Sequence, residues 1–286
     1  MATWREDVGP PWYGVDDAIM RTLEVFETRV DALGPARELI DLGDAMALFD
    51  RDDPDPFFNR VGAIRWPTEP AALDSRIRAV LRLFEARQRQ PYLWLPSGFI
   101  SPPDLPDRLR ARGFIEVGGG ARVMLHVRDP RTGRLRELPP GASIQRLGAD
   151  GPGTAPAEAW AAAGVVAEAF GVSADRSRSL ALEIAADVED PAADVRMVRV
   201  DGVPAAGGRR HGFDRMSYLS AIGVRAAYQG LGLGEAVTRA LVEGALGAGH
   251  ELIYLGVYAE NDRATRMYRR VGFEVLGGTA AEYLLP

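Results

Sequence analysis

The sequence predicts a mixed α/β (α+β) protein of two tandem domains, each with a mostly antiparallel mixed sheet flanked by helices. Three observations support this prediction. The chain has 286 residues, whereas a typical domain has roughly 150. Helix-like and strand-like patterns mix irregularly along it, which favours a partly antiparallel sheet. A segment near the middle of the chain is similar to one near its end, which indicates an internal repeat.

The repeat aligns LRARGFIEVGG at 109–119 with YRRVGFEVLGG at 268–278, and the Gly-Phe and Gly-Gly pairs keep their spacing. The strand-like runs that flank the two copies lie at 92–95 and 123–127, and at 252–258 and 283–285. We therefore expect a strand, a helix ending at Gly-Phe and a hairpin to form a unit used twice. The copies differ where Leu109 stands in the first and Tyr268 in the second, so a hydroxyl is replaced by an apolar side chain.

The two copies are separated by a segment typical of a linker. Residues 129–143, DPRTGRLRELPPGAS, are rich in proline, glycine and charge and lack apolar periodicity. We therefore expect one domain at 1–135 and another at 142–286. In the first domain, residues 55–67 contain several aromatic side chains, and 74–89 have the pattern of an amphipathic helix.

The composition excludes several kinds of chemistry. There is no cysteine, so disulfides, thiolate nucleophiles and cysteine-ligated metals are absent, and we expect no metal site. All 34 basic residues are arginine, which excludes a Schiff-base lysine and the lysine-containing P-loop. The net charge of -6 argues against nucleic acid as the main partner. No long apolar run and no signal-like start are present, which predicts no membrane association and a cytoplasmic location.

The elements of the second domain follow from apolar periodicity. We expect strands at 143–147, 196–200, 204–211, 215–224 and 252–258, with two more at the C-terminal end, and helices at 157–170, 178–188, 235–248 and 262–271. The helix at 235–248 has an apolar face at helical spacing, formed by Val237, Ala240, Leu241, Ala245 and Ala248.

A glycine-rich turn joins the strand at 215–224 to the helix at 235–248. Gly230, Gly232 and Gly234 stand at alternate positions, where they let the backbone approach an anion closely. The start of the following helix carries a partial positive charge that favours phosphate, so this turn predicts a pyrophosphate site without a lysine. A dinucleotide fingerprint of the GxGxxG type is excluded, because the third glycine is missing. The alternative is a tight strand-to-helix connection without a ligand.

The neighbouring residues favour the ligand. The order Q-x-x-G-x-G at Gln229, Gly232 and Gly234 resembles the acetyl-CoA motif of the GCN5-related N-acetyltransferases (the GNAT family). The preceding strand, SAIGV, and Asn261 followed by Tyr268 and a Gly-Phe pair resemble the same family. The resemblance covers roughly 143–286. The first domain has the late strand-helix-GF unit without the glycine-rich turn, so it resembles a degenerate copy in a tandem protein of this family.

The resemblance implies that acetyl-CoA lies where the strand ending at Val224 splays from the strand beginning near Leu252. Backbone groups of Ile222 and Val224 would bind the pantetheine arm, and N–H groups of the turn the pyrophosphate. The cofactor-binding residues that it implies are Ile222, Val224, Gln229, Gly230, Leu231, Gly232, Leu233, Gly234, Glu235, Asn261 and Tyr268. For Asn261 a helix N-cap is the structural alternative, and the two roles are compatible.

The resemblance implies transfer of acetyl from acetyl-CoA to a primary amine, which we expect to belong to a small molecule. Direct attack in a ternary complex requires alignment of the two substrates. The phenol of Tyr268 would protonate the departing sulfur, while the structural alternative is packing under the Gly-Phe turn. Protein amines remain a second class of acceptor, and a non-catalytic acyl-CoA sensor remains a second class of function.

Something must take the proton of the amine, and the sequence leaves four candidates open: Glu168, His211, Asp214 and Glu260. For His211 we expect a solvated position at a turn between two strands.

Tyr218 and Ser220 should alternate onto one face of their strand with Ile222, where they line the amine pocket or only pack.

The first domain either covers the amine site or only stabilises its partner. Trp12, Trp66 and Trp94 are candidates for an aromatic wall around the acceptor, with burial in the core as the favoured alternative. Two fused copies can replace a homodimer, so a monomer and a homodimer are both compatible with the sequence.

Overall fold

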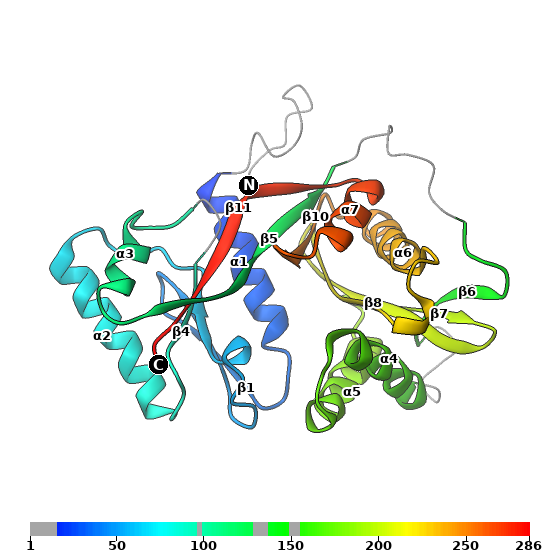
Figure 1. The fold of residues 1–286 in the computed structure, drawn as a ribbon, viewed down its shortest axis with the longest axis horizontal. Coiled ribbons are helices and arrows are strands. Elements are labelled where there is room, and N and C mark those ends of the chain that lie inside the picture. The colour runs from blue at the N-terminus through cyan, green and yellow to red at the C-terminus, as the bar shows by residue number, and fades with distance from the viewer. Residues whose placement is uncertain (1–15, 96–98, 128–136, 149–154) are drawn as a thin grey trace. The chain divides into compact units, whose positions relative to one another are not determined.

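The computed structural model describes residues 16–95, 99–127, 137–148 and 155–286. The chain divides into two compact units. Unit 1 contains Met1–Val123, Tyr258–Glu260 and Val275–Pro286, and unit 2 contains Met124–Val257 and Asn261–Glu274. Each unit has a mixed, mostly antiparallel set of strands flanked by helices, which confirms the predicted fold class (Figure 1).

Unit 1 has its strands in the order β1-β2-β3-β4-β11-β5. They are β1 (Arg37–Asp41), β2 (Met46–Asp50), β3 (Arg60–Gly62), β4 (Tyr92–Leu95) and parts of β5 (Ile115–His126) and β11 (Phe273–Leu284). The helices are α1 (Asp17–Asp31), the 3-10 turn η2 (Pro56–Phe58), α2 (Pro70–Ala86) and α3 (Leu105–Arg110). β3 and β4 are parallel and are joined by α2, whereas β1, β2 and β3, as well as β4 and β11, pair antiparallel.

The main core of unit 1 lies against α2. The apolar face of this helix is buried and consists of Leu73, Ile77, Val80 and Phe84. Each such side chain contributes roughly 1.5–3 kcal/mol when it leaves water. The helix expected at 74–89 is confirmed as α2, and it begins earlier because Glu69 caps its start and Pro70 suits a first helical position.

Unit 2 has strands in the order β10-β9-β8-β7-β6. They are β6 (Ala142–Arg146), β7 (Ala193–Val200), β8 (Val203–Phe213), β9 (Met216–Val224) and β10 (Leu252–Tyr258), the last residue of which falls in unit 1. The helices are α4 (Ala155–Phe170), α5 (Ala174–Glu189), the 3-10 turn η3 (Ala226–Tyr228), α6 (Leu233–Gly247) and α7 (Asp262–Val271). Each strand from β6 to β9 pairs antiparallel with the next. β9 pairs parallel with β10, and α6 connects these two strands along the chain.

Helices cover both faces of this sheet, with α4 and α5 on one side of β7 and β8 and α6 on the other (Figure 1). Two glycines show how closely they approach. A Cβ on Gly208 would lie 2.9 Å from Cγ1 of Val237 on α6. A Cβ on Gly223 would lie 2.7 Å from Cβ of Ala169 on α4. Successive residues of β8 and β9 therefore point alternately toward α4 and α5 on one face and toward α6 on the other.

The repeated unit is present as β4-α3-β5 and β10-α7-β11. Each helix is followed by a left-handed glycine: Gly272, with φ +103°, is the C-cap of α7, and Gly113, with φ +87°, lies three residues after the last residue of α3. The expected hairpins are wrong, because β5 and β11 are each one long strand. The glycines there serve close backbone approach: a Cβ on Gly120 would lie 2.2 Å from the carbonyl oxygen of Ala280.

The remaining expected elements of unit 2 occur with shifts of a few residues, and α7 has the predicted bounds. On α6, Val237, Leu241 and Ala245 are buried as predicted, while Ala248 is exposed because the helix ends at Gly247. Residues 129–136 of the linker expected at 129–143 lie outside the described residues, so the domain boundary stays a prediction. Within the described part of the chain, no helix has the length and apolarity needed to cross a membrane.

Candidate active site

The strands β9 and β10 pair over only part of their length. Their parallel register runs from Met216 opposite Leu252 to Leu219 opposite Leu255. Beyond these pairs both strands continue, to Val224 and past Gly256, and Gly256 is exposed. The two strands therefore open in the direction of the glycine-rich turn.

A bulge in β9 coincides with this opening. The pairs Gly207↔Gly223 and Arg209↔Ser220 flank it, so β9 contains one more residue than β8 between them. Ala221 has a φ of +52°, a left-handed conformation that is rare for a residue with a Cβ. Bulges redirect side chains and often lie beside functional sites.

The bulge corrects one expectation about side-chain direction. Ser220 faces the same side as Arg209, its partner on β8. Ile222 points to the opposite, α6 side, where its Cγ1 would lie 2.9 Å from a Cβ on Gly208. Tyr218 and Ser220 thus share a face, but Ile222 does not join them, because the extra residue reverses the alternation.

In the glycine-rich turn each glycine has its own physical reason. Gly230 and Gly232 have φ of +87° and +80°, which other residues adopt only with strain. A Cβ on Gly234 would lie 3.3 Å from Cγ2 of Val224 and crowd the end of β9. The side chain of Leu233 is buried in the core and that of Leu231 is exposed, so only backbone groups of these two residues line the turn.

Gly232 is the N-cap of α6, and no side chain caps this helix. The first N–H groups of any α-helix lack acceptors within the helix, and they carry its partial positive charge. Because no side chain competes for them here, the start of α6 can accept an anion such as a phosphate.

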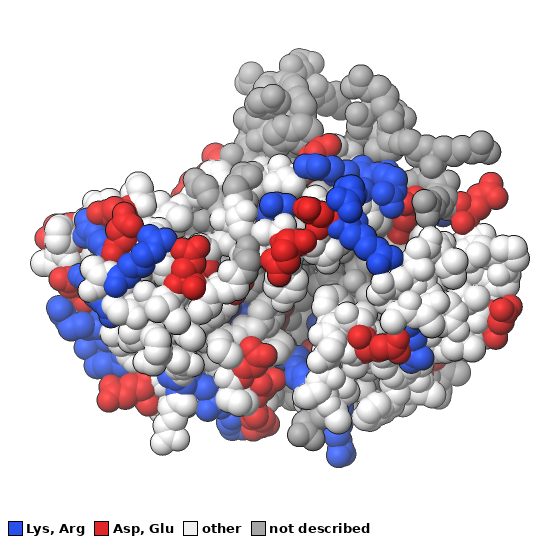
Figure 2. Space-filling model, in the orientation of Figure 1, with Lys and Arg blue, Asp and Glu red and all other residues white. Residues whose placement is uncertain are grey.

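Arginines increase the positive potential beside the turn. Exposed arginines of α7 gather on one face of the molecule (Figure 2), and they are Arg263, Arg266, Arg269 and Arg270. Arg263 Nη1 donates to Gln229 Oε1 at 2.7 Å, and Arg270 Nε bonds Glu235 Oε2 at 2.9 Å. The buried carboxylate of Glu235 is therefore balanced by Arg270, and the local charge suits a polyphosphate.

Tyr268 lies on α7, buried against Phe273, with 6.0 Å between the ring centroids. The Tyr268 ring therefore packs in the core, as the structural alternative for this residue expected. Burial raises the pKa of the Tyr268 phenol well above its ordinary value of 10, so the group stays protonated at neutral pH. Its hydroxyl has no protein hydrogen-bond partner within the described ranges. Such a phenol can donate a proton to a leaving group.

Asn261 caps α7, since its Oδ1 accepts from the N–H of Ala264 at 3.0 Å. The structural alternative for this residue is thus confirmed, while contact with a cofactor stays a prediction. Its side chain remains exposed, so the two roles are compatible.

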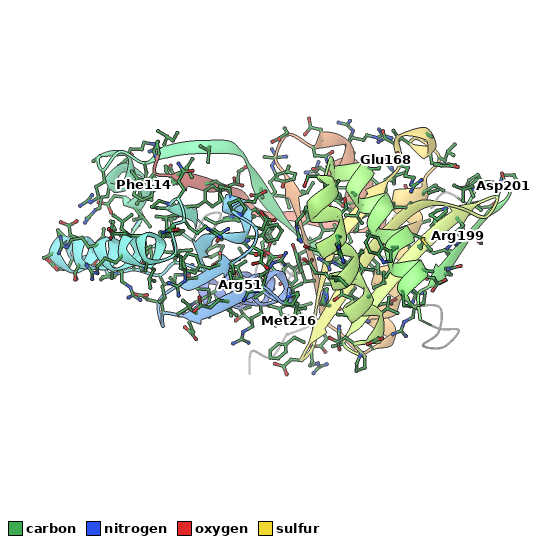
Figure 3. All side chains as sticks on the ribbon, turned by 90° about the horizontal axis from the view of Figure 1, so that it is seen from below. Arg51, Phe114, Glu168, Arg199, Asp201 and Met216 are labelled. Carbon is green, nitrogen blue, oxygen red and sulfur yellow. The ribbon has the colours of Figure 1, made fainter. Side chains whose placement is uncertain are left out.

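Glu168 lies near the turn. Its Oε1 accepts from the N–H of Ala226 at 3.1 Å, and its Oε2 lies 3.6 Å from Arg225 Nε. Figure 3 shows Glu168 and Met216 at opposite ends of unit 2, so β9 runs from Met216 toward Glu168. The contacts with Ala226 and Arg225 hold Glu168 as a support of the loop.

Asp214 lies in the turn between β8 and β9, at the end of β9 away from the glycines. A strand of this length spans roughly 30 Å, so Asp214 is remote from the opening. Glu260 is exposed and directly precedes Asn261.

The solvated turn expected for His211 is wrong. His211 lies within β8, is 3% exposed, and its Nε2 is 2.8 Å from Asp187 Oδ1. Glu183 and Asp187 of α5, and Arg209 of β8, belong to the same buried group, and the sequence interpretation missed them. The sequence signal for this group was weak. Glu183 and Asp187 are four residues apart, on one face of a helix, and Arg209 and His211 are two apart, on one face of a strand.

The corresponding helix start in unit 1, that of α2, is capped by a side chain. α2 joins parallel strands β3 and β4 as α6 joins β9 and β10, but its N-cap is Glu69. The carboxylate of Glu69 accepts from the N–H groups of Ala71 and Ala72, and these bonds lower its pKa. The place available for an anion at α6 is thus occupied by the protein's own carboxylate at α2.

The other differences in unit 1 agree with this. Leu109, the counterpart of Tyr268, is fully buried in the core. Trp66 is also core, Trp94 is half-buried against Phe57, and Trp12 lies outside the described residues.

Comparison with known proteins gives a family for the second half of the chain. Residues 166–273 match the model of the acetyltransferase (GNAT) family. N-alpha-acetyltransferase RimI of Mycobacterium tuberculosis is 45% identical over 56 residues, which are 20% of this chain and 34% of that protein. The match thus spans about a third of the length of that curated relative.

Solved structures show the same fold over most of the chain. A GCN5-related N-acetyltransferase from Kribbella flavida has a TM-score of 0.67 at 22% identity, with 94% of this chain and 96% of that one covered. A tandem GNAT protein from the clavulanic acid biosynthesis pathway has a TM-score of 0.61 at 17% identity, covering 90% and 86%.

The opening between β9 and β10 and the glycine-lined, uncapped start of α6 lie within the residues that match this family model. Residues 166–273 thus match the acetyltransferase (GNAT) family, and the chain shares its fold with solved GNAT proteins, a tandem GNAT protein among them.

Proposed function

We propose that this protein is an N-acetyltransferase that transfers acetyl from acetyl-CoA to a primary amine, in a ternary complex, and that the amine belongs to a small molecule. The observation that supports this most strongly is the opening between β9 and β10 next to the uncapped start of α6. The opening leaves backbone groups of β9 without partners on β10. The uncapped start of α6 favours a pyrophosphate.

In this proposal the chain binds acetyl-CoA along one path. Backbone groups of Ile222 and Val224 hold the pantetheine arm, and the N–H groups of the turn from Gly230 to Glu235 hold the pyrophosphate. The arginines of α7 add attraction for phosphate. Asn261 contacts the arm while it caps α7.

The reaction needs a neutral amine, a polarised carbonyl and a protonated leaving group. Aligning amine and thioester supplies most of the acceleration. The amine nitrogen attacks the thioester carbon, the C–S bond breaks, and the Tyr268 phenol protonates the sulfur. Because burial keeps this phenol protonated, it is available over the physiological pH range.

The test is release of free thiol from acetyl-CoA in the presence of a panel of amines, followed with a thiol-reactive dye. The protein has no cysteine and contributes no background. Changing Tyr268→Phe should lower kcat by about 10²–10⁴-fold while the Kd of acetyl-CoA changes little. Tyr283→Phe is the matched control, since that buried tyrosine hydroxyl in unit 1 bonds Glu116 and has no role in the proposal.

A non-catalytic acyl-CoA sensor gives a different pattern. It binds acetyl-CoA, releases no thiol with any amine, and its affinity is insensitive to Tyr268→Phe. That result would replace the enzyme by a binding module.

A further inference from the structure

A buried ionic group lies between α5 and β8. Asp187 Oδ2 is 2.8 Å from Arg209 Nη1, and Asp187 Oδ1 is 2.8 Å from His211 Nε2. On the same side of α5, Glu183 pairs with Arg176 at 2.7 Å and lies 3.8 Å from Arg209. Two carboxylates and two guanidinium groups balance in charge, and the imidazole of His211 is the member of this group that can both donate and accept a hydrogen bond.

The contact with Asp187 fixes which nitrogen of His211 carries a proton. Burial by itself would raise the pKa of Asp187, but the hydrogen bond from His211 and the charge of Arg209 outweigh it and lower this pKa. Asp187 is therefore ionised at neutral pH and can only accept hydrogen bonds. Nε2 of His211 must then carry the hydrogen, and in the neutral ring the lone pair is on Nδ1.

That lone pair has no partner. Nδ1 of His211 is buried and makes no hydrogen bond to the described part of the chain. An unsatisfied buried acceptor in a native structure is costly, and it commonly marks a bound water or a chemical role. An imidazole held at Nε2 by a carboxylate, with a free Nδ1, has the form of an oriented base.

A second buried polar atom without a partner lies close by. Ser220 Oγ makes no hydrogen bond to any described residue. In the β8–β9 register Ser220 is opposite Arg209, and Tyr218 is opposite His211. Ser220 and His211 are thus diagonal neighbours on one face, roughly 7–8 Å apart between Cα atoms, a span that one water can bridge.

Ser220 also borders the opening. Leu219 makes the last pair with β10, Ser220 is the next residue, and the bulge at Ala221 follows. Ser220 therefore stands between the proposed place of the thioester and the imidazole of His211. The other candidates differ in place: Asp214 is at the far end of β9, Glu168 supports the loop, and Glu260 is exposed and belongs to unit 1.

We infer that Ser220 and His211 form the route by which the acceptor amine loses its proton, with Asp187 as the residue that positions the imidazole. This inference rests on the proposed function.

The protonated amine passes one proton through the Ser220 hydroxyl and a water to Nδ1 of His211, and Asp187 stabilises the imidazolium. The free amine attacks the thioester carbon, so a C–N bond forms and the C–S bond breaks. Tyr268 protonates the sulfur and regains a proton from the nitrogen of the adduct. His211 releases the first proton to solvent after the amide leaves, so the products are the amide, CoA thiol and one proton.

The charged and titratable groups that face His211 come from three elements. They are Asp187 and Glu183 from α5, Arg209 beside it on β8 and Tyr218 on β9. The ionisable residues of α4, which also covers β8 and β9, are engaged elsewhere: Glu158 accepts from Gln145, and Glu168 from Ala226.

The test is the pH dependence of kcat/KM for thiol release, from pH 5.5 to 9.5, in the full chain. His211→Gln keeps an amide donor at the position of Nε2 and removes the base. The expected result is a loss of about 10²-fold or more at pH 7, with the wild-type plateau replaced by a rate that rises tenfold per pH unit as free amine becomes available. The Kd of acetyl-CoA should not change.

Two further variants make the test specific. Ser220→Ala should lower kcat/KM at pH 7 about tenfold or more, and Ser220→Thr, which keeps the hydroxyl, should restore it. His250→Gln is the matched control, because His250 is a half-buried histidine of the same unit that bonds Ser217. Its pH profile should equal that of the wild type.

If the wild type releases thiol and His211→Gln keeps the wild-type profile, the inference is overturned while the proposed function stands. If His211→Gln does not fold, equal activity of the Ser220→Ala and Ser220→Thr variants overturns it instead. If the wild type binds acetyl-CoA and acetylates no amine, the proposed function fails, and the inference fails with it.

Discussion

Glu69 and Gly232 occupy the same place in two copies of one motif: each is the N-cap of the helix that joins two parallel strands. Glu69 fills the helix start with its own carboxylate, through bonds to Ala71 and Ala72, whereas Gly232 offers no side chain. The carboxylate of Glu69 is thus one physical difference between the two helix starts, and the glycine-rich turn before α6 is another.

Removing the cap tests this difference. Glu69→Ala should lower the melting temperature and leave acetyl-CoA affinity unchanged, while Glu85→Ala, an exposed charge later on α2, serves as the control. The pKa of Glu69 is lowered in the fold, so its stabilisation is present above its ordinary pKa of 4.5 and is lost as pH falls through the folded value. Scanning calorimetry at pH 7 and pH 3 should show the difference between variant and wild type shrinking in acid. A weaker affinity for acetyl-CoA in Glu69→Ala would contradict the account.

Gly230→Ala and Gly202→Ala form a matched pair. Both glycines have left-handed φ, +87° and +80°, and in both cases an added Cβ would meet nothing within 4 Å. Each substitution should cost about 1–2 kcal/mol of stability through backbone strain. Only Gly230→Ala, in the candidate site, should also weaken acetyl-CoA binding, by tenfold or more, as measured by calorimetric titration. Equal affinities for the two variants would remove the turn from the site.

The buried phenol predicts a feature of the pH profile. Since burial raises the pKa of Tyr268 above 10, kcat should show no alkaline decline up to about pH 9.5 from loss of this acid. The profile is read with saturating substrates. A decline that begins near pH 9 and disappears in Tyr268→Phe would show that the phenol ionises near its ordinary pKa of 10, and it would contradict the account.

Glu24 of α1 links stability to pH. Burial raises the pKa of Glu24 from 4.5 to about 7, although Arg65 Nη1 lies 3.1 Å from its Oε2. Between these values the folded state binds a proton that the unfolded state lacks, so stability falls as pH rises, by up to about 3 kcal/mol.

Glu24→Gln should remove this dependence, and urea titrations at pH 5, 6, 7 and 8 measure it. The difference in unfolding free energy between wild type and variant should change steadily up to pH 7 and then level off. A constant difference would mean that Glu24 titrates normally. Glu85→Gln, which removes an exposed charge, is the control.

The parts of the fold that local chemistry determines could be predicted from the sequence. Both ends of α7 are of this kind, because Asn261 caps its start and Gly272 adopts the left-handed stop. The glycine-rich turn was predicted for the same reason, since the spacing of glycines and the following helix are local. The cap at Asn261, the structural alternative that the sequence offers for this residue, is also local, since its acceptor serves the N–H of Ala264 three residues on.

The parts that depend on distant partners could not be predicted. The glycines of β5 resemble a turn, yet Gly120 lies against Ala280, which is far away along the chain. His211 was expected in solvent because its neighbours include turn residues, while its partner Asp187 belongs to another helix. No residue pattern in the sequence predicts the bulge at Ala221. This bulge turns the side chain of Ile222 to the opposite face of the sheet.

The most direct test of the central claim, that the start of α6 binds acetyl-CoA, is calorimetric titration of the full chain with acetyl-CoA, repeated with Gly232→Trp. The account predicts micromolar affinity, one site per chain, and loss of binding in the variant, while Gly202→Trp binds as the wild type does. No binding by the wild-type protein, or equal binding by Gly232→Trp, would contradict it.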